Sequence, residues 1–345
     1  MTKKIVTLAG DGIGPEIMSA GLEVLAALAP KIDFDYEIDP KNFGGAAIDA
    51  DGHPLPETTL NAAKNADAIL LAAIGGPQYN DAPVRPEQGL LSLRKALGLF
   101  ANIRPVQIFD ALKHLSPLKP EIIDGVDFVV VRELTGGIYF GEHTLNERTA
   151  RDVNDYSYEE IERIIKVAFE IAEKRGKKVT SVDKQNVLAT SKLWRIVAED
   201  VAKSYPHVAL EHALVDSLAM KMITNPSDFD VIVTENLFGD ILSDESSVLP
   251  GTLGVMPSAS HAANGPSLYE PIHGSAPDIA GLGIANPISM ILSVAMMLRE
   301  SFGETIGAQY IENAVNKTLL DGILTKDLGG KASLKEMTAA IISNL

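Results

Sequence analysis

The feature that most constrains this chain is the alternation of short apolar runs with amphipathic segments along nearly all of its 345 residues. The short runs are typical of buried strands, and the longer segments carry apolar residues at helical spacing. This alternation predicts an α/β architecture with much parallel sheet. We expect strands at residues 5–9, 34–38, 68–74, 127–131, 178–182 and 230–233, and helices at residues 16–28, 92–97, 159–174, 193–203 and 289–299.

The segment from Gly136 to Asp155 departs from this pattern, because it is polar and rich in turn-forming residues. Long excursions of this kind are often functional or interfacial. We therefore interpret residues 136–155 as a protruding arm.

Composition and charge exclude several classes of protein. The 46 acidic and 30 basic residues give a net charge of −16, which disfavours nucleic acid and anionic membrane surfaces as partners. Because cysteine is absent, any metal must bind to oxygen or imidazole ligands. The apolar stretch Ile288–Leu298 is too short to span a membrane, and the start of the chain does not resemble a signal peptide. We expect a cytoplasmic protein.

The segment Gly10–Pro15 (GDGIGP) imitates a dinucleotide-binding fingerprint, since it joins a predicted strand to a predicted helix. The third glycine of a true fingerprint allows the helix to approach the strand closely, but Pro15 occupies that place. Proline suits the first turn of a helix instead. We favour a glycine-rich strand-to-helix turn over a true fingerprint.

Three arginines end or follow apolar runs, namely Arg94, Arg104 and Arg132. Guanidinium groups held at the ends of core elements suit the capture of carboxylates. The alternative is three unrelated salt bridges.

Asp240 and Asp244 are four residues apart, which places both carboxylates on one helix face. With Asp216 as a third oxygen ligand, this set suits Mg²⁺ or Mn²⁺. The alternative is a helix N-terminus decorated with acids that complement the dipole. Near a dication and arginines, Lys184 would have a lowered pKa and act as a base, and Tyr139 would be acidified, but spacing alone assigns neither role.

A last cluster runs from Glu270 to Ile279 and is followed by Asn286. Its small residues permit close backbone approach to a ligand, and its acid, Asp278, could accept both hydroxyls of a ribose. The alternative is a surface loop rich in turn formers.

Taken together, five segments of the chain resemble the β-decarboxylating dehydrogenase family: Gly10–Glu16, Gly89–Arg94, Arg132–Gly141, Asn236–Asp244 and His273–Asp278. The resemblance runs from about residue 3 to the C-terminus. It implies the two-domain α/β fold of isopropylmalate and isocitrate dehydrogenases, which is not a Rossmann fold. The first domain would comprise residues 1–98 and 252–345 and bind the cofactor, and the second would comprise residues 99–251 and carry the metal site, the dimer interface and the arm.

The resemblance implies NAD-dependent oxidative decarboxylation of 3-isopropylmalate to 4-methyl-2-oxopentanoate, a step of leucine biosynthesis. Arg94, Arg104 and Arg132 would hold the carboxylates of the malate group. Lys184 would be the base in hydroxyl oxidation, and Tyr139 the acid that protonates the enol.

The resemblance also implies a divalent metal, Mg²⁺ or Mn²⁺, on Asp216, Asp240 and Asp244. It implies a homodimer in which Lys184 and Asp216 reach into the neighbour's site, where Asp216 would also contact the substrate. Asp278 would bind the adenosine ribose of NAD. The expected cofactor contacts are Glu87, Gly75, Gly76, His273, Gly274, Ser275, Ala276, Asp278, Ile279 and Asn286.

Leu90 precedes Arg94 by one helical turn and would face the substituent of the malate group. An isopropyl group fits there, whereas the third carboxylate of isocitrate would be desolvated without a partner and repelled by Glu87. Three alternatives stay open: a relative that acts on D-malate, tartrate or homoisocitrate, a non-catalytic regulatory subunit, and a metal-dependent lyase without redox chemistry.

Overall fold

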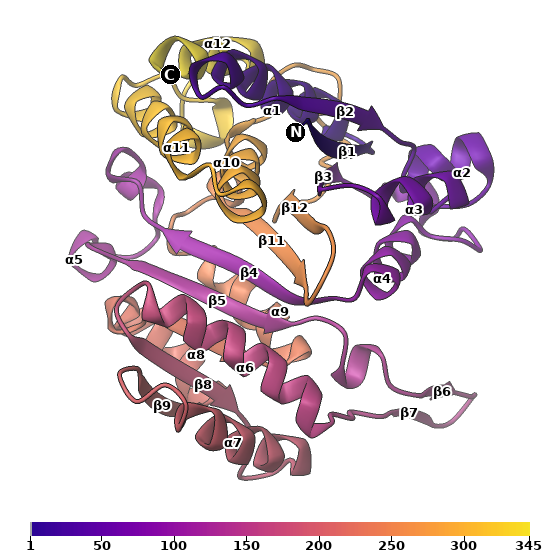
Figure 1. Ribbon diagram of the computed structural model, residues 1–345, viewed down its shortest axis with the longest axis vertical. Helices are drawn as coiled ribbons and strands as arrows, with labels where there is room; N and C mark the ends of the chain where they lie inside the picture. Colours follow the sequence, from indigo (N-terminus) through magenta and orange to yellow (C-terminus); the bar gives the residue numbers. More distant parts are fainter. Residues whose placement is uncertain (1) are drawn as a thin grey trace. The chain divides into compact units, whose positions relative to one another are not determined.

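The computed structural model describes residues 2–345, which form two compact units (Figure 1). The first unit contains the chain up to Leu99, Phe109–Leu115 and Thr252–Leu345, and the second contains Phe100–Ile108 and Ser116–Gly251. Both ends of the chain therefore contribute to the first unit.

The first unit is built on five strands in the order β2-β1-β3-β12-β11. The pairings of β1 with β2 and β3, and of β3 with β12, are parallel, whereas β11 and β12 are antiparallel. The strands are β1 Lys3–Gly10, β2 Tyr36–Pro40, β3 Ala68–Ala73, β11 Pro257–Ala262 and β12 Ser267–Pro271. Every residue of β3 is buried, as expected for a central parallel strand.

This order confirms that the fold is not a Rossmann fold. A Rossmann sheet repeats the strand–helix–strand unit on both sides of its first strand. Here, β3 is flanked instead by a hairpin from the C-terminal part of the chain, which forms β11 and β12. The glycine-rich segment after β1 does open a helix, and Pro15 occupies its first turn as predicted.

In the first unit, helix α1 packs against helices α10 and α12. Helix α10 is buried along nearly its whole length, so the longest apolar stretch of the sequence is a core helix. The helices are α1 Gly14–Leu28, α2 Gly45–Asp51, α3 Glu57–Lys64, α4 Pro86–Leu97, α10 Ile288–Phe302, α11 Thr305–Leu320 and α12 Leu334–Asn344. Within residues 2–345, no helix has the length and apolar character needed to cross a membrane.

The second unit has a sheet of five strands in the order β4-β5-β10-β8-β9, parallel except for the antiparallel pair β4 and β5. The strands are β4 Leu99–Gln107, β5 Asp127–Glu133, β8 Lys178–Asp183, β9 Ala209–Leu214 and β10 Val231–Thr234. The helices are α5 Pro120–Ile123, α6 Tyr158–Glu173, α7 Ala189–Ala202, α8 Val215–Thr224 and α9 Asn236–Ser246.

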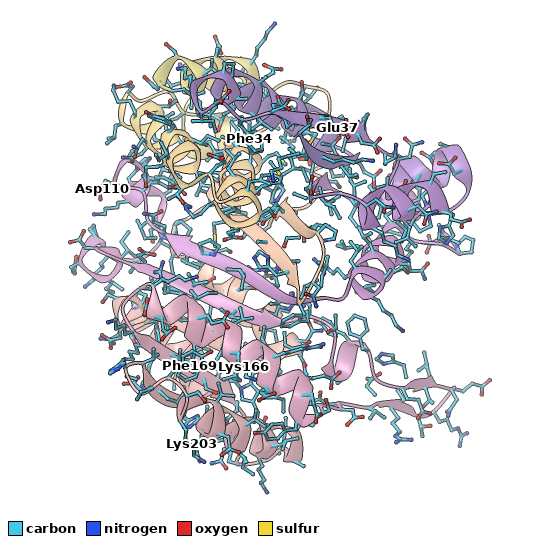
Figure 2. The ribbon with its side chains drawn as sticks, in the orientation of Figure 1. Phe34, Glu37, Asp110, Lys166, Phe169 and Lys203 are labelled. Atoms are coloured by element: carbon cyan, nitrogen blue, oxygen red, sulfur yellow. The ribbon has the colours of Figure 1, made fainter. Side chains whose placement is uncertain are left out.

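Helix α6 shows how the sequence sets a local element. Ser157 caps its start, because its side chain accepts a hydrogen bond from the amide of Glu160. The amide of Ser157 in turn donates to the carboxylate of Glu160. Phe169 on this helix is fully buried, whereas the side chain of Lys166 is half exposed (Figure 2). The amphipathic pattern therefore buries one face of α6 on the sheet.

The predicted arm is a hairpin of β6 (His143–Leu145) and β7 (Ala150–Asp152), which extends from the second unit in Figure 1. The chain enters the arm through a 3₁₀ turn at Gly137–Tyr139. Strand β2 differs from its predicted range, because it begins at Tyr36 rather than at residue 34. Asp33 has a φ of 53°, so the chain turns there, and the ring of Phe34 packs on Phe302.

Candidate active site

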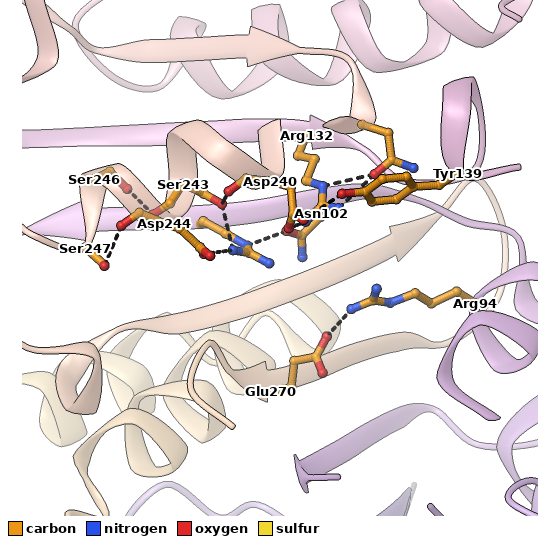
Figure 3. A network of polar contacts seen from close by, with 12 residues as sticks. Arg94, Asn102, Arg132, Tyr139, Asp240, Ser243, Asp244, Ser246, Ser247 and Glu270 are labelled. Carbon is orange, nitrogen blue, oxygen red and sulfur yellow. Dashed lines mark hydrogen bonds and ion pairs between the residues drawn. The ribbon is translucent and has the colours of Figure 1, made fainter. Parts of the chain in front are cut away.

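The centre of the second unit's polar cluster is Arg132, near the end of β5 (Figure 3). Its Nε and Nη2 donate to Oδ1 of Asn236 at 3.1 and 2.8 Å, and its Nη1 is ion-paired with Asp240. Both partners lie on α9. The side chain of Arg132 is only 5% exposed, so burial and two acceptors fix its orientation.

Gly239 permits this approach of α9 to β5. A Cβ atom at this position would lie 2.5 Å from Cγ of Arg132. The helix therefore needs glycine between the two residues that bind the guanidinium, Asn236 and Asp240.

Arg104 is brought to the same sheet face by the register of β4 and β5. Asn102 pairs directly with Arg132, and residues two apart on a strand share a face. The Nε of Arg104 donates to Asn102 at 2.8 Å, and Nη1 donates to Oγ of Ser243 at 2.7 Å and lies 3.6 Å from Asp244. Two of the three predicted arginines and two of the predicted aspartates thus form one cluster.

Tyr139 joins this cluster through its hydroxyl, which donates to Oδ2 of Asp240 at 2.8 Å (Figure 3). Its ring lies 5.8 Å from the guanidinium carbon of Arg132. Partial burial and the Asp240 carboxylate raise the pKa of Tyr139, and the opposing effect of Arg132 is smaller. The expectation that a bound dication and the arginines acidify this phenol stays a prediction, since it depends on the metal.

Lys184 and Asp216 form a separate pair in the second unit. Lys184 follows β8, and its Nζ donates to Oδ1 of Asp216, in the first turn of α8, at 2.6 Å. This hydrogen bond lowers the pKa of Asp216.

Within one chain, the three predicted metal ligands Asp216, Asp240 and Asp244 do not form one group. Across residues 2–345, no three His, Cys, Asp or Glu side chains form a group that could hold a metal ion. Asp240 and Asp244 nevertheless present carboxylates one turn apart on α9, with side chains 40% and 77% exposed. Two accessible carboxylates fit a hard dication, whose coordination needs further oxygen ligands from elsewhere.

Three loops of the first unit, around Ile13, Gly75 and Ser275, contact one another, and the last two carry cofactor residues predicted from the resemblance. The amide of Ile13 donates to the carbonyl of Ser275 at 2.8 Å, and the hydroxyl of Ser275 donates to the carbonyl of Gly75 at 2.7 Å. Gly75 has a φ of +97°, and a Cβ there would lie 2.9 Å from a carboxylate oxygen of Glu87. The GDGIGP segment thus supports the Ser275 loop.

Asp11 holds these loops in place, a role that no sequence pattern indicated. Its carboxylate accepts hydrogen bonds from the amides of Gly45, Ala46 and Gly75 at 2.8, 2.7 and 2.8 Å. Asp11 is 8% exposed, so one buried acceptor connects the start of α2 with the Gly75 loop.

The loop from His273 to Asn286 is anchored at its end, where Nδ2 of Asn286 donates to Asp327 at 3.0 Å. Burial lowers the pKa of His273, which favours the neutral imidazole. Asp278 is exposed, and Ala276 has a φ of 39°. Small residues and an accessible carboxylate fit a nucleotide carrying a ribose.

Arg94, the third predicted arginine, lies on α4 in the first unit. Its Nη2 is ion-paired with Glu270 at 2.9 Å, and both side chains are mostly buried (Figure 3). Its buried Nε has no hydrogen-bond partner among residues 2–345. Leu90, one turn earlier, is partly buried against a core cluster that includes Leu93.

Sequence reasoning missed the residues that orient the arginines, including Asn236, Asn102, Ser243 and Glu270. Asn236 opens the same sequence segment as the two aspartates, so its place on the α9 face was a usable signal. Asn102 had no such signal, because its role depends on the register between β4 and β5.

Comparison with known proteins places the chain in a family of dehydrogenases. The family described as isocitrate/isopropylmalate dehydrogenase matches residues 4–341. The chain is 79% identical to a 3-isopropylmalate dehydrogenase of Streptococcus thermophilus (strain CNRZ 1066) over 345 residues, which is 100% of both chains. It is 61% identical over 346 residues to a 3-isopropylmalate dehydrogenase of Listeria innocua serovar 6a, covering 100% of this chain and 99% of that one.

Solved structures are similar along the whole chain. The isocitrate dehydrogenase of Methylococcus capsulatus matches with a TM-score of 0.89 and 35% identity, covering 99% of each chain. The β-decarboxylating dehydrogenase of Thermococcus kodakarensis matches with a TM-score of 0.85 and 37% identity, covering 99% of this chain and 96% of that one.

Proposed function

Because this chain belongs to the isocitrate/isopropylmalate dehydrogenase family, we propose that it oxidises and decarboxylates 3-isopropylmalate to 4-methyl-2-oxopentanoate with NAD⁺, in leucine biosynthesis. The observation that carries the proposal is the buried Arg132 held beside Asp240 and Tyr139. It combines a carboxylate-binding cation, a metal-binding carboxylate and a proton donor.

The arginines bind the carboxylates of the substrate. Arg132 and Arg104 are oriented by side-chain acceptors, and the buried Nε of Arg94 supplies a donor without a partner among the described residues. Planar guanidinium groups bind carboxylates through two parallel hydrogen bonds. Fixed cations of this kind hold the malate group in one orientation for reaction.

Lys184 of the partner subunit takes the proton from the substrate hydroxyl, and Tyr139 gives a proton to the enol after carbon dioxide leaves. A lysine accepts a proton only when it is neutral, so its pairing with Asp216 must end when substrate binds. The phenol of Tyr139 carries an O–H group that already donates to Asp240, which suits a proton donor.

Bound NAD⁺ supplies the hydride acceptor, and a bound Mg²⁺ or Mn²⁺ supplies polarisation of the oxygen at the oxidised carbon. Asp240 and Asp244 would hold the metal together with Asp216 of the partner subunit in a homodimer. The expected NAD contacts are Glu87, Gly75, Gly76, His273, Gly274, Ser275, Ala276, Asp278, Ile279 and Asn286.

The expected location of the enzyme is the cytoplasm. Leu90 selects the isopropyl group of the substrate. A hydrophobic contact there favours a branched alkyl substituent and disfavours the third carboxylate of isocitrate.

The test measures NADH formation by the purified protein with NAD⁺ and Mn²⁺. We expect turnover of 3-isopropylmalate to exceed turnover of D-malate, tartrate, homoisocitrate and isocitrate, and Lys184→Met to abolish it. Decarboxylation without NADH would instead indicate a lyase, and no turnover of any of these acids would indicate a regulatory subunit.

A further inference from the structure

Glu133 is a fully buried carboxylate at the end of β5, next to Arg132. Neighbouring residues of a strand point to opposite sheet faces. Arg132 contacts α9 on one face, and Glu133 contacts Arg163 of α6 on the other, with Nη2 at 3.1 Å. The mechanism above gives Glu133 no role.

The carboxylate of Glu133 accepts hydrogen bonds from the turn that follows the strand. The amide of Gly136 donates to Oε2 at 2.7 Å, and the amide and hydroxyl of Thr135 donate to Oε1 at 3.0 and 2.9 Å. The hydroxyl of Tyr156 contributes a longer bond of 3.3 Å. Because all these groups donate, the site requires an acceptor on both oxygens.

The Tyr156 ring packs tightly on the same turn. A Cβ atom added at Gly136 would lie 2.6 Å from the Tyr156 ring. One added at Gly137, which has a φ of +72°, would lie 2.6 Å from the Tyr156 hydroxyl. The chain therefore passes between the Glu133 carboxylate and the Tyr156 ring in one conformation. Tyr139, in the 3₁₀ turn Gly137–Tyr139, follows at once.

Asn236 connects this turn to the arginine cluster. Its amide donates to the hydroxyl of Tyr156 at 3.0 Å, and its Nδ2 donates to the carbonyl of Gly136 at 3.3 Å. Its Oδ1 holds the guanidinium of Arg132. A shift of the Gly136 turn would therefore move Tyr139 relative to Arg132.

We propose that Glu133 is a positioning residue that sets the location of the Tyr139 hydroxyl by holding the Thr135–Gly137 turn. This inference rests on the proton-donor role proposed above for Tyr139. It predicts that loss of the second acceptor oxygen at Glu133 affects catalysis through Tyr139 and not through substrate binding.

The test compares Glu133→Gln, Tyr139→Phe and the double variant in the full-length enzyme with 3-isopropylmalate, NAD⁺ and Mn²⁺. Loss of a general acid lowers kcat by roughly a hundredfold or more, so this is expected for Tyr139→Phe. For Glu133→Gln we expect a fall in kcat of about tenfold, with KM for 3-isopropylmalate changed less than about threefold. In the double variant, Glu133→Gln should lower kcat by no more than about twofold beyond Tyr139→Phe, because two residues that act through one group are not additive.

Glu235→Gln is the matched control. Glu235 is also a buried carboxylate of the second unit, but its hydrogen-bond partner is Asn154 and not the Gly136 turn. Its kcat should stay within about twofold of the unchanged enzyme. Amide exchange at Thr135 and Gly136 should accelerate in Glu133→Gln and not in Glu235→Gln.

Thr135→Val is the second variant if Glu133→Gln does not fold. It removes one donor to Glu133 and one acceptor of Arg163, and it should give a smaller fall in kcat with the same non-additivity toward Tyr139→Phe. Wild-type kcat in Glu133→Gln, or a full multiplicative loss in the double variant, would overturn the positioning role. A wild-type rate in Tyr139→Phe would instead refute the donor role of Tyr139 in the proposed function.

Discussion

Replacing Asp11 by asparagine tests whether one buried carboxylate organises the cofactor loops. The change keeps one acceptor oxygen and turns the other into an NH₂ group that faces backbone N–H donors. At least one of the bonds to Gly45, Ala46 and Gly75 is then lost, and the others become bonds to a neutral acceptor.

The magnitude follows from these three contacts. A hydrogen bond to a charged group contributes about 1.5–3 kcal/mol, and one to a neutral group about 0.5–1.5 kcal/mol. One lost bond and two weakened ones predict a decrease of about 4–5 kcal/mol in the free energy of unfolding. Because Gly75 belongs to the proposed NAD site, we also expect KM for NAD⁺ to rise roughly tenfold, a change of about 1.4 kcal/mol.

Urea unfolding followed by circular dichroism at fixed protein concentration measures the first effect, and initial rates against NAD⁺ concentration measure the second. Asp49→Asn is the control, because the exposed Asp49 accepts a single hydrogen bond, from Tyr79 at 2.9 Å. It should change stability by less than about 0.5 kcal/mol. If Asp11→Asn behaves like this control in both assays, the reasoning about the shared acceptor is wrong.

Four further predictions concern single features of the two units. Burial lowers the pKa of His273, so below the ordinary histidine pKa of about 6.5 the unfolded chain binds a proton that the folded chain does not. The free energy of unfolding therefore falls as the pH decreases from about 6.5. In urea unfolding between pH 7 and 5, His273→Asn should reduce this pH dependence. Gly239→Ala places a Cβ 2.5 Å from Cγ of Arg132, so it should lower the free energy of unfolding by about 1–3 kcal/mol and kcat/KM by roughly tenfold or more. A kcat/KM equal to that of the unchanged enzyme would contradict the need for a close approach of α9 to β5. Chelation with EDTA should abolish NADH formation, added Mn²⁺ should restore it, and Asp244→Asn should raise the Mn²⁺ concentration for half activation roughly tenfold, which a titration of activity measures. Leu90→Ala should lower kcat/KM for 3-isopropylmalate by about ten- to thirtyfold and leave that for D-malate nearly unchanged, since only the former carries the isopropyl group; a parallel loss for both acids would place Leu90 outside the specificity contact.

Much of the α/β pattern was readable from the sequence because burial in a parallel sheet leaves a strong local signal. The runs that became β3, β5 and β10 are mostly apolar, whereas β8 carries a buried threonine and serine between its two valines. The predicted bounds of all four strands lie within two residues of those found. Strands β4, β9, β11 and β12 were missed, since polar residues interrupt the apolar pattern of each one.

The candidate site was predictable where a helix carries its residues. Asp240 and Asp244 follow from a spacing of four, and the structure adds Asn236 on the same helix. The environment of Tyr139 was not predictable, because its pKa depends on an aspartate that is 101 residues away in the sequence and 2.8 Å away in space. Long-range geometry of this kind has no local signature.

The assembly of the first unit from both ends of the chain affects the order of its synthesis. The inner edge of β3 pairs with β12, which the ribosome makes only after residue 266. At translation rates of roughly 5–20 residues per second, the fully apolar β3 waits on the order of ten to forty seconds for this neighbour. During that interval a nascent strand edge lies open to the wrong partners, so we expect this half of the protein to depend most on chaperones in the cell.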